Sequence, residues 1–225
     1  NPKYGYGAGV NPCIDCRIFI LKKAKEYAEE IDAKFFITGE VLGQRPMSQH
    51  KRALRTIERD SGLEGKILRP LSAKHFPPTI AEEEGWVDRE ELLDIQGRSR
   101  KEQLKLAEEK GVDIFLCAGA GCLLTDKRFA AKFNDFVKYN EKLTYKDIFL
   151  LKTGRHFRFN DSKIVVGRRE EENKQIELRK YDSDYLFEVP EISGPLTLLQ
   201  GEKSEEAIEF AAALTLMYSD HEEEI

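Results

Sequence analysis

Four cysteines in two close pairs are the residues of this 225-residue chain best suited to chemistry. Cys13 and Cys16 have the C-x2-C spacing that lets two thiolates grip one metal ion from a turn opening into a helix. The N-terminus of that helix would favour the anionic thiolate. Cys117 and Cys122 add two more thiols. In an intracellular chain of this size, such pairs more often bind metal or react than form disulfides.

The spacing of the cysteines leaves three interpretations open. All four could hold structural zinc, although four residues between Cys117 and Cys122 are a wide spacing for a zinc ribbon. Three could hold an iron–sulfur cluster that leaves one iron open and the fourth cysteine spare. The thiols could also be plainly buried or joined in a disulfide.

A loop with two glycines, residues 39–44 (Gly-Glu-Val-Leu-Gly-Gln), directly follows a short apolar run. Glycine permits close approach of the backbone to a ligand, and a helix expected to start near Ser48 would direct its N-terminus at an anion. The pattern therefore indicates a candidate anion site, with an ordinary strand-to-helix loop as the alternative.

Cations alternate with aromatic side chains over residues 154–159 (Gly-Arg-His-Phe-Arg-Phe). On a strand, the odd-numbered members share one face and the even-numbered members share the other. Such a strip could hold phosphates and stack a base, and a half-buried strand with one solvated face is the alternative. The candidate RNA contacts are Arg155, Arg158, Arg168 and Arg169.

These residues must be positioned by strands and helices that alternate along the first half, a pattern typical of a parallel sheet covered by helices. Apolar periodicity predicts helices over 16–32, 48–59 and 98–110 and strands over 34–38, 66–70 and 112–116. The second half should hold strands over 155–159, 163–166, 185–189 and 196–199, with helices over 129–139, 169–180 and 204–218.

Composition limits the classes of function. With 34% charged residues and a net charge of -5, the chain is not a uniformly basic nucleic-acid binder, so any RNA contact must use a local patch. Residues 151–180 hold nine basic and five acidic groups, whereas 181–225 hold one basic and twelve acidic groups. No apolar run approaches the ~18 residues of a membrane span, and no signal peptide is visible, so we expect a cytoplasmic protein without a membrane partner.

Several motifs of the first half together resemble the adenylating domain of 4-thiouridine and 2-thiouridine tRNA synthases, which are PP-loop ATPases of the adenine-nucleotide alpha-hydrolase fold. These motifs are Cys13-x-x-Cys16, Phe-Ile-Thr38-Gly39-Glu40-x-Leu42-Gly43-Gln44, Ser48-Gln49 and Leu68-Arg69-Pro70-Leu71. A CxxC followed much later by a third cysteine is similar to the iron–sulfur-dependent tRNA thiolases. Such chains are often named tRNA (5-methylaminomethyl-2-thiouridylate)-methyltransferase. The resemblance covers roughly residues 1–125.

From Gly154 onward the chain is similar to the NFACT-R RNA-binding domain. This resemblance rests on residues 163–173 (Lys-Ile-Val-Val-Gly-Arg-Arg-Glu-Glu-Glu-Asn), the Ser193-Gly194-Pro195 turn and residues 211–220. Together the two resemblances imply an α/β protein. We expect a partial parallel-sheet, Rossmann-like domain of the alpha-hydrolase type over 1–126, a helical linker over 127–150 and a small α+β domain over 151–225.

The activity implied by these resemblances is sulfur insertion into a tRNA uridine, with tRNA and a sulfur donor as partners. ATP and Mg²⁺ would adenylate the uridine carbonyl, and a [4Fe-4S] cluster or a cysteine persulfide would supply sulfur. The cluster would be held by Cys13, Cys16 and either Cys122 or Cys117. The nucleotide side of the site would be lined by Gly39, Glu40, Gly43, Gln44 and Arg69.

One departure limits this expectation, because the family's Ser-Gly-Gly-x-Asp-Ser phosphate loop does not occur in the sequence. We therefore expect a missing N-terminal segment, a homo-oligomer, or a chain that does not adenylate RNA. Two further alternatives stay open. They are a non-catalytic RNA-binding module with a structural cysteine–zinc site, and an enzyme that removes sulfur from thiolated uracil.

Overall fold

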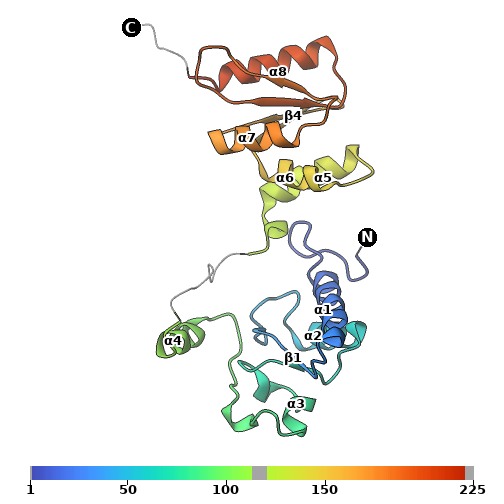
Figure 1. The fold of residues 1–225 in the computed structure, drawn as a ribbon, viewed down its shortest axis with the longest axis vertical. Helices are drawn as coiled ribbons and strands as arrows, with labels where there is room; N and C mark the ends of the chain where they lie inside the picture. Colours follow the sequence, from blue (N-terminus) through green and yellow to red (C-terminus); the bar gives the residue numbers. More distant parts are fainter. Residues whose placement is uncertain (1, 113–120, 221–225) are drawn as a thin grey trace. The chain divides into compact units, whose positions relative to one another are not determined.

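The computed structural model describes residues 2–112 and 121–220 and divides the chain into two compact units, Asn1–Cys122 and Leu123–Ile225 (Figure 1). Each unit has its own apolar core, and the two are described separately. No helix in these described ranges is long and apolar enough to cross a membrane.

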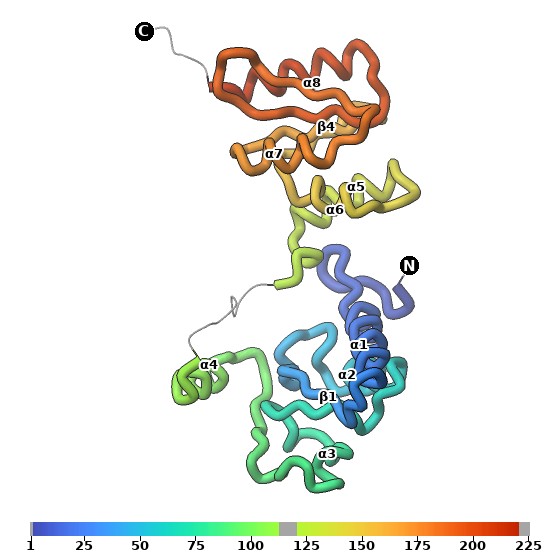
Figure 2. Tube along the Cα trace, viewed as in Figure 1, coloured from blue at the N-terminus to red at the C-terminus, as the bar shows by residue number. Residues whose placement is uncertain are grey.

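The first unit is built around a parallel pair of strands, β1 (Phe36–Ile37) and β2 (Ile67–Leu68), in which Phe36 lies opposite Ile67. Its main core joins apolar residues of α1, α2 and β2. The tube in Figure 2 shows the course of α1 and α2 beside the β1 strand. The other elements are α1 (Cys13–Glu30), α2 (Lys51–Ser61), η1 (Ala73–His75), α3 (Ile80–Glu83), η2 (Arg89–Glu91) and α4 (Lys101–Glu109). Among the described residues the predicted parallel sheet is present only as this pair. The strand expected over 112–116 lies, apart from Val112, outside them.

The boundaries of two helices decide where the site residues lie. α1 begins at Cys13, three residues before the predicted start, so both cysteines of the CxxC motif lie in its first turn. α2 begins at Lys51, where the His50 side chain accepts a hydrogen bond from the Ala53 N–H at 3.2 Å. The helix predicted from Ser48 therefore starts later, and residues 48–49 remain in the loop.

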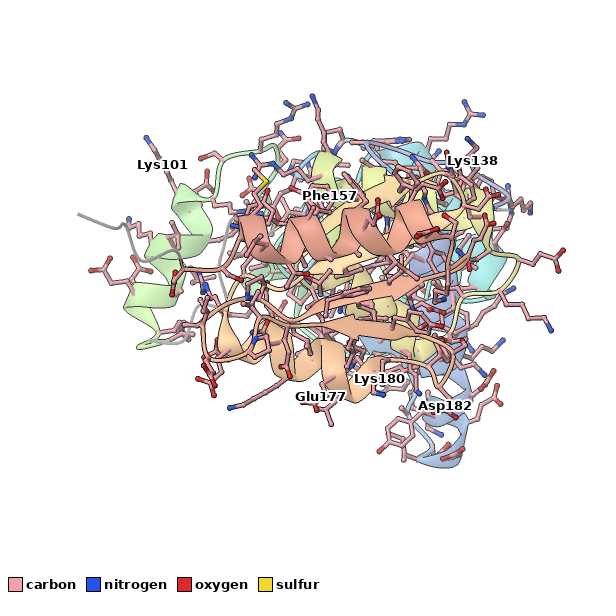
Figure 3. All side chains as sticks on the ribbon, turned by 90° about the horizontal axis from the view of Figure 1, so that it is seen from above. Lys101, Lys138, Phe157, Glu177, Lys180 and Asp182 are labelled. Atoms are coloured by element: carbon pink, nitrogen blue, oxygen red, sulfur yellow. The ribbon has the colours of Figure 1, made fainter. Side chains whose placement is uncertain are left out.

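The second unit contains a four-stranded antiparallel sheet in the order β3-β4-β6-β5, whose strands lie where the sequence predicted them. One face packs against α8 through Ile164, Val166, Leu199 and Leu214, and Figure 3 shows Phe157 labelled beside that helix. The elements are η3 (Leu123–Thr125), α5 (Lys127–Tyr139), α6 (Tyr145–Lys152), β3 (Arg155–Phe159), β4 (Ser162–Val166), α7 (Glu170–Arg179), β5 (Tyr185–Phe187), β6 (Thr197–Gln200) and α8 (Glu205–Met217).

The opposite face of this sheet is covered by α6 and α7. Leu150 of α6 packs in one cluster with Val165, Ile176 and Leu198. The segment 127–150, which the sequence suggested as a linker, therefore lies within the second compact unit, because α6 buries its apolar side chains against the sheet. The three layers, α8, sheet and α6 with α7, hold the candidate RNA-binding arginines on a fixed scaffold.

Candidate functional site

The CxxC motif occupies the first turn of α1, which places its two thiols on neighbouring positions of one helix face. Cys13 is half-buried and Cys16 is exposed, and neither is in a disulfide. Both therefore have accessible sulfur atoms at the start of a helix.

The pKa of the Cys16 thiol is raised above its ordinary value. Burial raises the pKa of the Cys16 thiol, and the charges of Cys13 and Cys122 raise it further. The neighbouring Arg17 acts in the opposite direction. That the helix N-terminus favours the thiolate stays a prediction, and Cys117 lies outside the described residues.

A polar cavity of about 500 Å³ opens beside Cys13 at the carboxyl end of β1. Such an edge is where open α/β sheets hold their ligands. The cavity combines a thiol, two guanidinium groups, hydroxyls and a glycine backbone, and is lined by Cys13, Arg17, Ile37, Thr38, Gly39, Glu40, Gln44, Arg45, Ser48 and Gln49. The structure thus brings Cys13 together with three of the predicted nucleotide-site residues.

Glu40 lines the cavity, and its carboxylate is also the centre of a buried ion-pair cluster. Its carboxylate pairs with Arg17 of α1 at 2.8 Å and with Arg69 at 3.1 Å. Arg69 also pairs with Glu58 of α2. Because Glu40 and Arg69 are about 5% and 3% exposed, both charges depend on these partners. We call these four residues, Arg17, Glu40, Glu58 and Arg69, the buried ion-pair cluster.

The other two residues predicted for the nucleotide side, Gly43 and Arg69, do not line the cavity. Gly43 has a positive φ of 78°, which favours glycine, and its N–H donates to the Gln49 carbonyl at 2.6 Å. Arg69 lies behind Glu40 and does not line the cavity. Three buried polar atoms at this site have no hydrogen-bond partner among the described residues: Arg17 Nε, Arg69 Nη2 and Gln49 Oε1. Since unpaired buried polar groups are costly, they indicate a place for a polar ligand or water.

The donor chemistry of the cysteines suits soft metals, since thiolates bind zinc and iron–sulfur clusters. Among the described residues, however, no three Cys, His, Asp or Glu side chains are arranged so that they could hold one ion. Because Cys117 lies outside these residues, a centre that includes it stays a prediction.

In the second unit, three of the four candidate RNA-binding arginines line one cavity of about 380 Å³. Arg155 lies over the Tyr218 ring at 4.4 Å, and Arg168 pairs with Glu172 at 2.5 Å. Arg169 precedes α7, whose N-terminus has no side-chain cap. The full lining is Arg155, Gly167, Arg168, Arg169, Glu170, Asn173, Ser193, Gly194, Pro195, Tyr218 and Asp220.

Arg158 lies elsewhere, on the opposite face of β3. Its guanidinium donates to both carboxylate oxygens of Asp135 in α5, at 3.0 and 2.7 Å, and Lys163 pairs with the same carboxylate at 2.6 Å. Although burial acts to raise it, these hydrogen bonds hold the pKa of Asp135 at about 2. Arg158 is thus neutralised by a close partner.

The alternation predicted for β3 is confirmed, but its aromatic residues pack inside the unit. Phe157 and Phe159 lie against α8, with their rings 6.3 Å from Tyr218 and 5.3 Å from Phe210. The half-buried-strand alternative therefore describes the two phenylalanines better than a base-stacking platform does.

Sequence reasoning missed several residues that shape both cavities. Arg17 and Arg45 enter the first, and Asn173 and Tyr218 enter the second. A cation directly after the CxxC motif was the one available signal, for Arg17. The others depend on contacts between segments far apart in the chain.

Comparison with known proteins matches two separate segments of the chain to two families. Residues 9–75 match the family described as thiamine biosynthesis protein (ThiI), and residues 154–225 match the family described as NFACT protein RNA binding domain. Searches of curated proteins and of solved structures found no match. The two matches confirm both resemblances seen in the sequence. The chain thus joins a segment similar to the ThiI family to a segment similar to the NFACT RNA-binding domain.

Proposed function

We propose that this chain acts in sulfur transfer to RNA, with the first unit presenting sulfur and the second binding the RNA. The observation that carries the proposal is the position of Cys13. It lies in the wall of a polar cavity, one helical turn from Cys16, within the segment that matches the ThiI family. A unit of the same chain matches an RNA-binding domain, which makes tRNA the expected acceptor.

The chemistry requires a leaving group on the acceptor base. A uracil carbonyl oxygen leaves poorly, so ATP would transfer its adenylyl group to that oxygen and release pyrophosphate. A sulfur nucleophile would then attack the ring carbon, and AMP would leave with the original oxygen. Gly39, Glu40, Gly43 and Gln44 are the residues that we assign to the nucleotide side. Arg69 is a positioning residue, because it holds Glu40 from behind.

Within this proposal the two CxxC thiols have different roles. Cys13 lines the cavity, so we assign it the transferable sulfur, held as a persulfide that forms when the Cys13 thiolate takes the outer sulfur of a donor persulfide and the donor thiol leaves. The raised pKa of Cys16 keeps its thiol protonated at neutral pH. When Cys16 loses that proton, its thiolate can attack the Cys13 sulfur. This attack forms a Cys13–Cys16 disulfide and frees the sulfur on the base.

An iron–sulfur cluster on Cys13, Cys16 and either Cys122 or Cys117 is the other form in which sulfur could be presented. The two forms are separated by purifying the protein anaerobically, measuring iron and sulfide, and detecting persulfide by mass spectrometry. Persulfide on Cys13 without iron supports the carrier role. Iron and sulfide in a ratio near one, lost in the Cys13→Ser variant, would replace it with the cluster.

The transfer itself is tested by nucleoside mass spectrometry of tRNA incubated with the protein, ATP, Mg²⁺, a persulfide as donor of sulfane sulfur, and a thiol that reduces the Cys13–Cys16 disulfide after each transfer. Thiouridine should form with the wild-type chain and be lost in Cys13→Ser, whereas Arg128→Ala, an exposed change in the second unit, should leave it intact. If the intact protein yields no thiouridine, or if Cys13→Ser retains full yield, the proposal fails. Loss of thiouridine from pre-thiolated tRNA would indicate the reverse reaction.

Binding of tRNA is tested apart from catalysis. Changing Arg155, Arg168 and Arg169 to Ala together should weaken binding and lower the slope of log K against log salt by roughly one for each phosphate that is no longer neutralised. Each of the three arginines is also changed to Ala alone. Arg128→Ala removes the same kind of charge outside the cavity and is the control for these single variants. An unchanged affinity in the triple variant would refute the role of this cavity in RNA binding.

A further inference from the structure

Two cavities of the second unit adjoin one another along α7. The cationic cavity of about 380 Å³ shares four lining residues with a neighbour of about 320 Å³, namely Glu170, Asn173, Gly194 and Pro195. Each lies near the lower end of the ~300–1,000 Å³ range of small-molecule sites. Together they form one groove with two chemically different ends.

The first end of the groove carries positive charge. Arg155, Arg168 and Arg169 line it beside the carboxylates of Glu170 and Asp220, so positive charges exceed negative ones by one, and guanidinium groups match phosphate oxygens in shape and charge. Arg168 already pairs with Glu172, which orients its guanidinium, while Arg155 is held over the Tyr218 ring. This end therefore suits a phosphate group.

The second end combines apolar and charged side chains. Its apolar walls are Leu186, Val189, Ile192 and Leu196, and its charged groups are Lys174, Glu177 and Glu188 together with the shared Glu170. An apolar wall accepts the face of a flat ring, while a carboxylate oxygen accepts hydrogen bonds from an amino group. This end suits a nucleobase that carries an exocyclic amine.

The wall between the two ends is fixed by hydrogen bonds. Asn173 accepts from the Leu196 N–H at 3.0 Å and donates to the Gly194 carbonyl at 3.2 Å. On the other side, the Asp220 N–H donates to the Ser193 carbonyl at 2.9 Å. A Cβ on Gly194 would lie 2.5 Å from Ser219 Oγ, so the turn packs tightly against the end of α8. The 193–195 turn is thus held from both sides before any ligand arrives.

We infer that this groove binds one unstacked nucleotide of a single-stranded RNA, with its phosphate at the arginine end and its base at the apolar end. The inference rests on the proposed RNA binding of the second unit and names the ligand more closely. A nucleotide concentrates its charge at one end and carries a neutral ring at the other. At the base end three carboxylates, Glu170, Glu177 and Glu188, outnumber the single cation Lys174, so a neutral ring suits this end better than the carboxylates of an acidic peptide.

The test compares short fluorescent single-stranded RNAs with a duplex of the same sequence, using the full chain and anisotropy. Ile192→Asp places a carboxylate at the base end, and Ile192 is 43% exposed, so the substitution is compatible with folding. We expect it to weaken single-strand binding roughly tenfold, the scale of removing one apolar side chain from the base, and to leave duplex binding unchanged. Leu178→Asp, on α7 but outside the groove lining and 71% exposed, is the matched control.

The outcomes separate this inference from the RNA-binding proposal. If Arg168→Ala and Arg169→Ala weaken binding of all RNAs but Ile192→Asp has no effect, RNA binding stands and the nucleotide groove is refuted. If the arginine variants bind as well as the wild type, both ideas fail.

Homopolymers test the base end, since oligo(A) and oligo(C) should bind more tightly than oligo(U). Equal affinities would overturn the assignment of the carboxylates to an amino group.

Discussion

His156 of β3 should make the second unit less stable in mild acid, and the structure fixes both the sign and the size of the effect. Its Nε2–H donates to the carbonyls of Leu150 and Thr153 at 3.1 and 2.8 Å, while Nδ1 is buried without a hydrogen-bond partner among the described residues. Burial, helped by the charges of Lys132 and Lys163, lowers the pKa of His156 to about 3. The folded state therefore keeps the imidazole neutral.

An unfolded chain protonates this histidine near its ordinary pKa of about 6.5, so between pH 6.5 and 3 the unfolded state binds the additional proton. Stability contributed by His156 is thus fully present above pH 6.5 and is lost as the pH falls below it. From the two pKa values, the loss between pH 7 and pH 5 is about 2 kcal/mol. His156→Gln keeps a donor at this position but does not titrate.

The assay is urea unfolding at pH 7 and pH 5, followed by NMR signals of β4 amides, which lie in the core of the second unit. Carboxylates titrate equally in both proteins, so the difference between wild type and His156→Gln isolates the histidine. We expect the wild type to lose about 2 kcal/mol more than the variant over this range. An imidazole Cε1–H signal of His156 that titrates near pH 6.5 in the folded protein, or equal pH dependence of the two proteins, would refute the reasoning.

Three further substitutions test other parts of the structure. Glu40→Gln leaves the buried Arg69 with one carboxylate fewer, so the free energy of unfolding of the first unit should fall by about 3 kcal/mol. Urea unfolding followed by Trp86 fluorescence measures this loss, and the exposed control Glu84→Gln should leave the stability unchanged. Gly194→Ala should cost about 1–3 kcal/mol through its contact with Ser219, and Ser219→Gly should restore part of the loss, whereas additive effects would contradict that contact. Because Cys122 raises the pKa of Cys16, Cys122→Ser should shift the pH profile of the iodoacetamide reaction at Cys16 to lower pH. Peptide mapping measures the reaction at Cys16, and an unshifted profile would exclude the coupling.

Local patterns in the sequence predicted most of the second unit. Alternation over 154–159 and the apolar run of β4 fixed two neighbouring strands, because one buried face forces period-two spacing. The helix expected over 204–218 is observed as Glu205–Met217, and the Ser204 hydroxyl caps it by accepting from the Ala207 N–H. These features depend on residues close together in the chain.

The contacts that define the two cavities were beyond such patterns. Arg17, Glu40 and Arg69 meet only after α1, the β1 loop and β2 have packed together, and no periodicity in any of these segments indicates the others. Arg155 and Tyr218 are similarly distant in the chain. The start of α2 was placed too early because a histidine, rather than Ser48, caps it.

The buried ion-pair cluster also bears on how this sequence can change over time. Its two arginines and two glutamates have a formal charge of zero, so replacing any one of them leaves an uncompensated charge in a site with little water. Single replacements should therefore be rare in related chains, and permitted changes should come in pairs that remove one charge of each sign. Where Glu40 is replaced by an uncharged residue, position 17 or 69 is expected to have lost its cation as well.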